Sequence, residues 1–212
     1  MHSLTYGPDT ILRSEDFAKV PATWILNPAL IDLAPRVYQW YLSKSGNQEL
    51  GAMMGDGSPE SDRFTGFKFY CELTKKYMER AQMYSLKQMR RSEAVNWRVQ
   101  PYLFTSGYSG RDSRGLGPYE YHMDEQAFHI GNIDIIDGES APIRKVVENS
   151  PPDQPLFLTV FAGTMAGDTP ANIKKVADEL LKNPEDKKYH FLRGMDLAAT
   201  YRSWKGLPVN NC

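Results

Sequence analysis

The sequence predicts an α/β protein with mostly parallel strands joined by helical crossovers. Short β-rich runs alternate with helical patterns from about residue 22 to the end of the chain. Crossovers of this length favour parallel pairing of the strands. A hydrophobic share of 41% and a charged share of 24% are typical of a globular chain with a packed core.

The chain length limits which parallel architecture is expected. With 212 residues, one large domain over residues 1–212 is the simplest division. We count about six strands, whereas a complete eight-stranded barrel takes about 250 residues. The sequence therefore predicts an incomplete or irregular (β/α) barrel, or an open parallel sheet.

The first elements follow from local signals. Residues 22–27 form a short apolar run, a strand that ends in Asn27 followed by Pro28. This pair predicts a helix N-cap with proline at the first helical position. Pro35 should kink the following helix or split it in two, and Gly46 should end it.

The remaining elements alternate in the same way. The strongest unit is a continuous apolar run at 156–163, typical of a strand covered on both faces, followed by Thr169 as the N-cap of a helix. The other predicted strands are 50–54, 84–89, 101–106, 127–132 and 189–194, and the other predicted helices are 67–81, 141–149 and a terminal helix from residue 196.

Charge and composition exclude several classes of partner. The chain has 25 basic and 26 acidic residues, so no net field attracts nucleic acid or an anionic membrane. No apolar run approaches the roughly 20 residues that span a bilayer. The first residues show no secretory signal, which fits a cytoplasmic protein or a mature or truncated form. Cys71 and Cys212 predict no disulfide framework.

No cofactor is expected either. The GDG segment at 55–57 and the SGYSG segment at 106–110 lack the lysine of a phosphate-binding P-loop and the three-glycine dinucleotide pattern. There is also no G-x-S-x-G nucleophile elbow.

The acidic turn after the strand 50–54 is the first candidate for a functional site. In a parallel sheet or barrel, ligands bind beyond the carboxyl ends of the strands. Asp56 lies between two glycines there, and Glu60 follows. These two carboxylates, or one of them with Asp124, would suit the acid and base pair of glycoside hydrolysis. Equally, Asp56 is a good turn former, and Glu60 a good capping residue for the next helix.

A loop of roughly 20 residues after the strand 101–106 is the second candidate, because loops of this length are usually functional or mobile. Aromatic, acidic and imidazole side chains beside one another would suit a sugar, although the tyrosines could equally pack the loop onto the core. The predicted sugar-stacking residues are Tyr108, Tyr119 and Tyr121, and the residues predicted to bind hydroxyls are Asn27, His122 and Arg193.

The histidines raise the alternative of a metal site. His122 and His129 lie near Asp124 and Glu125, but their spacing matches no closed tetrahedral pattern. A hydrogen-bonded loop histidine is the default interpretation, and we predict no metal.

Part of the chain resembles a known family. Trp24, Pro28 and Leu30, followed by Leu33-Ala34-Pro35 and an aromatic-rich helix, are similar to the C-terminal domain of the GxGYxYP family of glycoside hydrolases. Gly55 and Gly57 match two glycines of its motif. Ser58, Glu60 and Ser61 stand where that family has its tyrosines and proline. The resemblance covers residues of about 15 to 206, with its most specific part at about 20 to 82.

The resemblance implies a secreted or periplasmic carbohydrate-active protein whose barrel lacks its N-terminal strands. Such a part-barrel either is a fragment or closes by pairing with another copy of the chain. The leading hypothesis is a glycoside hydrolase with Asp56 and Asp124 as acid and base and Glu60 in reserve. The alternatives are a non-catalytic glycan-binding or assembly module and, third, a metal-dependent glycan deacetylase with His122 and His129 as first suspects for the ligands.

Overall fold

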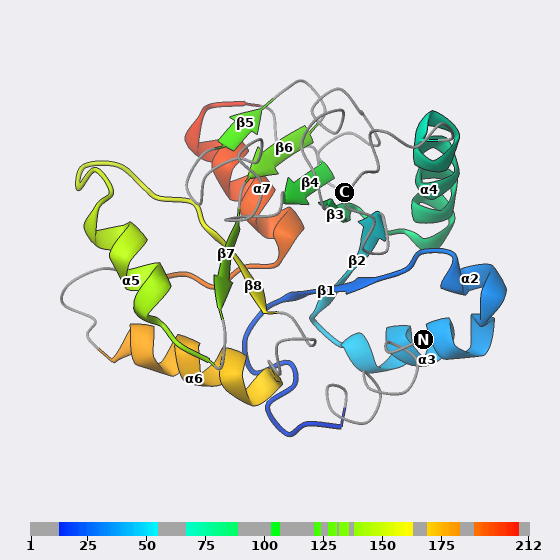
Figure 1. The fold of residues 1–212 in the computed structure, drawn as a ribbon, viewed down its shortest axis with the longest axis horizontal. Coiled ribbons are helices and arrows are strands. Elements are labelled where there is room, and N and C mark those ends of the chain that lie inside the picture. The colour runs from blue at the N-terminus through cyan, green and yellow to red at the C-terminus, as the bar shows by residue number, and fades with distance from the viewer. Residues whose placement is uncertain are drawn as a thin grey trace.

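The structure, a computed structural model shown in Figure 1, combines strands and helices, and five described strands between residues 85 and 135 follow one another without a described helix between them. The described residues are 13–54, 67–88, 103–106, 121–123, 127–130, 132–135, 138–162, 169–182 and 189–207. The strands are β1 (Thr23–Leu26), β2 (Glu49–Met54), β3 (Ser85–Gln88), β4 (Leu103–Ser106), β5 (Tyr121–Met123), β6 (Ala127–Ile130), β7 (Asn132–Ile135) and β8 (Thr159–Ala162). The helices are α2 (Leu30–Leu33), α3 (Pro35–Ser45), α4 (Phe67–Ala81), α5 (Ala141–Glu148), α6 (Pro170–Leu181) and α7 (Gly194–Trp204).

Parallel pairing dominates the strands. One sheet has the order β1-β2-β3-β4-β6-β5, and only the β5–β6 pair in it is antiparallel. Strands β7 and β8 form a second, parallel pair. The prediction of an α/β protein with mostly parallel strands is therefore confirmed. No pairing among the described strands closes them into a barrel.

Two strands that follow each other in the sequence, β6 and β7, belong to different sheets. Strand β6 ends at Ile130 and pairs with β4, whereas β7 begins at Asn132 and pairs with β8. Only Gly131 separates them in the sequence. The change of partner strand therefore takes place within one residue.

The local signals near the start of the chain act as predicted, with one shift. The side chain of Asn27 accepts a hydrogen bond from the Ala29 backbone N–H at 2.9 Å, so a turn precedes the helix and α2 begins at Leu30 rather than at Pro28. Pro35 begins α3 and so divides the predicted helix in two. Gly46 ends α3 with φ of 56°, a conformation that costs glycine little.

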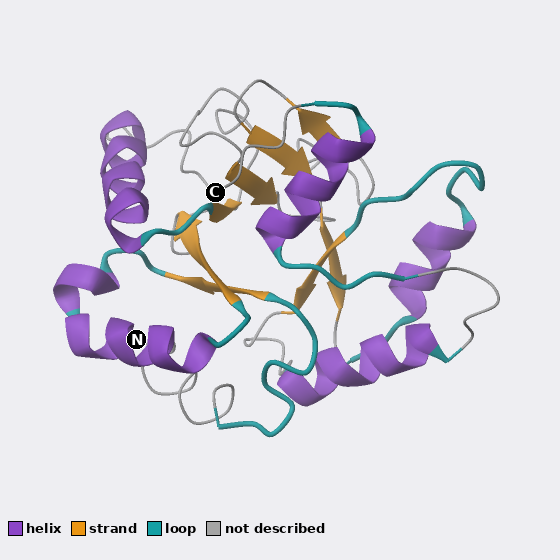
Figure 2. Cartoon of the chain, turned by 180° about the vertical axis from the view of Figure 1, so that it is seen from behind, coloured by secondary structure: helices purple, strands orange, loops and turns teal. Residues whose placement is uncertain are grey.

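Apolar cores lie on different parts of the described structure. The first packs α2, α3 and α4 against β1, β2 and β3 through Leu26, Tyr38, Met78 and Leu86 among others. The second packs α5 against α6 through Ile143, Val147, Val176 and Leu180. Figures 1 and 2 place α5 and α6 side by side, at the opposite end of the molecule from α3 and α4.

Helix α7 lies across the strands, on the side that faces the viewer in Figure 2, and packs against β4. The chain before it, from Tyr189 to Arg193, forms no strand, so the strand predicted at 189–194 is wrong. Its apolar residues Tyr189 and Phe191 pack against the α5–α6 core instead. The alternation of apolar residues in this segment therefore reflects packing against the α5–α6 core and not pairing in a sheet. No described helix is both long and apolar enough to cross a bilayer.

Candidate functional site

The carboxyl ends of the parallel strands define one edge of the six-stranded sheet. Met54, the last residue of β2, is in register with Gln88 of β3, and Lys87 is in register with Ser106 at the end of β4. Ser106 is in turn in register with Ile130 at the end of β6. We call this the carboxyl edge. The segments 55–66 and 107–120 both leave the sheet there.

Most of the predicted catalytic and stacking residues belong to these segments. Asp56, Glu60, Tyr108, Tyr119 and Asp124 lie outside the described residues. The strands that precede these segments, β2, β4 and β5, are described.

The antiparallel strand β5 returns from the carboxyl edge. Tyr121, its first residue, is in register with Ile130, so the segment 107–120 both starts and ends at this edge. Met123 is in register with Phe128, close to the start of β6. The predicted pair of Asp56 and Asp124 lies outside the described residues and stays a prediction.

The same register brings two predicted residues together. His122 lies directly opposite His129 on the neighbouring strand. Thr105 of β4 is the next position in this row. The sequence alone could not show this pairing, because β5 was not predicted as a strand.

Asn27 follows β1 at the carboxyl edge, as predicted, and its side chain is exposed. Its side-chain oxygen is occupied by the turn to Ala29. The amide nitrogen has no partner among the described residues and is the group that a ligand could use.

Arg193, the other described residue predicted to bind hydroxyls, lies at the opposite edge, where β2 begins. Its guanidinium donates to both carboxylate oxygens of Asp196 at 2.6 and 3.0 Å, and to the Asn47 carbonyl just before β2 at 3.5 Å. The hydrogen bond to Asp196 raises the pKa of Arg193 above its ordinary value. Arg193 was misplaced because residues 189–193 do not form the expected strand.

A polar cluster at the amino ends of β1, β2 and β3 was not predicted. Glu49 accepts hydrogen bonds from the hydroxyls of Thr23, at 2.8 Å, and Ser85. It also accepts one from the backbone N–H of Met195 at 3.1 Å, while the N–H of Gly194 donates to the Thr23 hydroxyl at 2.7 Å. We call these five residues the amino-edge cluster.

The amino-edge cluster holds the start of α7 on the sheet. A carboxylate at a helix N-terminus is favoured by the helix dipole and by unpaired N–H groups. The Glu49 carboxylate already has three internal donors, so its geometry is that of a structural cap rather than of an open catalytic group. A single acidic residue at the start of an apolar strand is common in protein sequences, so the sequence could not identify Glu49 as this cap.

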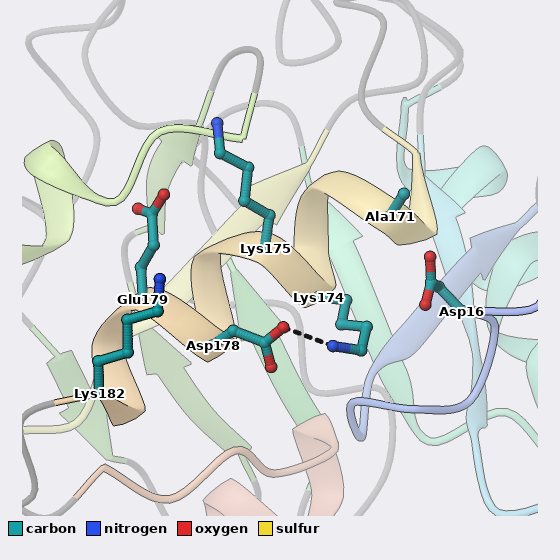
Figure 3. A pocket seen from close by; sticks show the side chains of 7 residues that line it. All are labelled: Asp16, Ala171, Lys174, Lys175, Asp178, Glu179 and Lys182. Atoms are coloured by element: carbon teal, nitrogen blue, oxygen red, sulfur yellow. Dashed lines mark hydrogen bonds and ion pairs between the residues drawn. The ribbon is translucent and has the colours of Figure 1, made fainter.

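A shallow hollow of about 470 Å³ lies along α6, beside the segment that carries Asp16 (Figure 3). Lys174 forms an ion pair with Asp178, and this hydrogen bond raises the pKa of Lys174. Glu179 accepts a hydrogen bond from the Ser140 hydroxyl at 2.7 Å. The complete lining is Asp16, Ala171, Lys174, Lys175, Asp178, Glu179 and Lys182. Three lysines face three carboxylates, so the hollow does not select for ligands of one charge.

The described residues contain no group of three histidine, cysteine, aspartate or glutamate side chains that could hold a metal ion. Comparison of the chain with family models, curated proteins and solved structures gives no match.

Proposed function

We propose that this protein binds a glycan at the carboxyl edge of its sheet and hydrolyses a glycosidic bond there, with Asp56 and Glu60 as the acid and base pair. The observation that carries the proposal is the shared edge. Strands β2 and β4 are both parallel to β3, which lies between them, so the strand ends that precede the segments 55–66 and 107–120 lie at the same edge, with one strand between them. This supports a single ligand site built from both segments.

The spacing of the strands is compatible with a sugar between the segments. Adjacent strands lie about 4.8 Å apart, so the ends of β2 and β4 are separated by roughly 10 Å. This separation is about the scale of a sugar ring with its hydroxyls. The sequence supplies Asp56 and Glu60 on one side, and Tyr108, Tyr119 and the edge residue Tyr121 on the other.

A panel of oligosaccharides tests the proposal when hydrolysis and binding are both recorded. Because each residue would transfer a proton in the transition state, Asp56→Asn and Glu60→Gln should each lower hydrolysis by about 10² to 10⁴-fold. Neither substitution should change the melting temperature or abolish binding. Glu72→Gln, an exposed position on α4, is the matched control and should hydrolyse normally.

A second function is favoured by the departure from the family motif. Ser58, Glu60 and Ser61 replace the motif's tyrosines and proline, which suits a module that binds glycans without cleaving them. Binding without hydrolysis in the unaltered protein would support this second function and refute the first. If no oligosaccharide binds, both are refuted.

A further inference from the structure

The segment of chain before β1 lies between two parts of the fold. We call residues 13–22 the strap, and we call β7, β8, α5 and α6 together the α5–α6 unit. Among the described strands, no pairing joins the β7–β8 sheet to the six-stranded sheet. Figures 1 and 2 both place the strap beside the start of α6, from where it continues into β1. The strap is therefore in a position to connect the α5–α6 unit to the six-stranded sheet.

The strap is attached to the six-stranded sheet through uncharged groups. The ring of Phe17 packs against the ring of Trp24 on β1, with the ring centroids 5.1 Å apart, and Trp24 in turn packs against the first core. The carbonyl of Ala22 accepts a hydrogen bond at 3.1 Å from the N–H of Glu49, the first residue of β2. Because these contacts involve no charged side chain, salt does not screen them.

The attachment of the strap to α6 is of a different kind. Asp16 of the strap and Lys174 of α6 line the same shallow hollow, so space remains between the strap and the helix (Figure 3). The pKa of Lys174 is raised first by the hydrogen bond to Asp178 and, in addition, by the charge of Asp16. Salt weakens an attraction across such an open gap, because the Debye length falls from about 10 Å at 0.1 M to about 3 Å at 1 M.

The strap also holds a backbone conformation that alanine rarely adopts. Ala18 has a φ of 65°, in the left-handed region that favours glycine. It is the third residue of a turn in which the Lys19 N–H donates to the Asp16 carbonyl at 3.2 Å. A strained conformation of this kind persists only where the surrounding contacts hold it in place. Release of the strap would relieve this strain.

We propose that the strap is a latch that holds the α5–α6 unit against the six-stranded sheet, and that it opens when the attraction between Asp16 and Lys174 is removed. The open latch leaves the unit connected through residues 189–195. Within that segment Phe191 packs against the α5–α6 core, and the Met195 N–H donates to Glu49 at 3.1 Å. The α5–α6 unit then moves relative to the sheet about this second connection.

Hydrogen–deuterium exchange of the full chain, followed by mass spectrometry of its peptides, tests the latch without any glycan. At 0.1 M salt, we expect the α5 and α6 peptides of Asp16→Asn to exchange at least two-fold faster than those of the unaltered chain, while the α3 peptides keep their rate. Glu15→Gln is the matched control, because it removes the same charge at the neighbouring exposed residue and should exchange like the unaltered chain. Equal rates in Asp16→Asn and Glu15→Gln would overturn the proposal.

Salt tests the same attraction in the unaltered chain. Raising the salt from 0.1 to 1 M should bring the exchange of its α5 and α6 peptides up to the rate of Asp16→Asn, whose own rate should respond less. An equal response of the two chains to salt would refute the role of Asp16.

A third variant acts in the opposite direction, so a folding defect cannot decide the result. Glycine adopts a positive φ at no steric cost, so Ala18→Gly should slow the exchange of the α5 and α6 peptides by at least two-fold at 0.1 M salt. Exchange as fast as in the unaltered chain, or faster, would show that the strap stores no strain and would count against the latch.

Discussion

Replacing Glu49 with alanine removes one acceptor from three donors at once, and the structure sets the size of the effect. The Ser85 hydroxyl is the most deeply buried of these groups, since Ser85 is only 1% exposed. A buried hydroxyl without a partner costs about 1 to 3 kcal/mol. Loss of the carboxylate at the start of α7 adds about 0.3 to 1 kcal/mol. Because Glu49 is only half-buried and water can replace part of it, we expect Glu49→Ala to lower the free energy of unfolding by about 2 to 3 kcal/mol.

Urea denaturation followed by circular dichroism measures this loss, provided that the slope of unfolding free energy against urea stays constant. Glu72→Ala, an exposed glutamate on α4, should change the unfolding free energy by less than about 0.5 kcal/mol. Adding Ser85→Ala to Glu49→Ala should restore about 1 kcal/mol, because it removes the stranded hydroxyl. If Glu49→Ala costs no more than Glu72→Ala, the amino-edge cluster does not anchor α7 and the reasoning fails.

Two further predictions concern the first core and its sheet. Tyr38 is 4% exposed and donates to the Ala81 carbonyl at 2.6 Å, so Tyr38→Phe should cost about 1 to 2 kcal/mol in urea denaturation, whereas Tyr84→Phe, at an exposed site, should cost little. Burial raises the pKa of Tyr38, so the unfolded chain loses the phenol proton at a lower pH than the folded protein does. The free energy of unfolding should therefore keep its full value below about pH 10, the ordinary pKa of tyrosine, and fall as the pH rises further. This fall should be smaller in Tyr38→Phe, which has no phenol proton at this position. A Cβ at Gly51 would lie 2.9 Å from the Ile25 side chain and 3.0 Å from a backbone carbonyl, so calorimetry should show a loss of about 1 to 3 kcal/mol in Gly51→Ala, and an unchanged melting temperature would contradict this packing.

Elements with a strong local signal could be predicted from the sequence. Pro35 divides a helix, Gly46 ends one, and Thr169 caps α6 by accepting a hydrogen bond from the Asn172 N–H. Each signal acts through the backbone of its own neighbours, so it needs no knowledge of distant contacts. The parallel sense of the main strands also followed, because long crossovers between consecutive strands leave few other arrangements.

Features that depend on distant contacts could not be predicted. Strand β5 is three residues long and exists because β6 pairs with it, and no alternating pattern of that length distinguishes it from a loop. Leu156 and Leu158 pack against the α5–α6 core, so β8 begins at Thr159 and not at the start of the apolar run. The candidate site shows the same limit. The position of Asn27 at the carboxyl edge could be predicted, because a local turn fixes it. The position of Arg193 could not, because its prediction assumed a strand at 189–194 that does not form.

The hydrogen bond between Met195 and Glu49 joins residues 146 positions apart in the chain. During translation at about 5 to 20 residues per second, roughly 7 to 30 s pass between the synthesis of these two residues. Over that interval the nascent sheet carries a carboxylate whose backbone donor has not yet been made. The amino-edge cluster can therefore close only after α7 has been synthesised, so the start of the sheet and this late helix reach their final contact together.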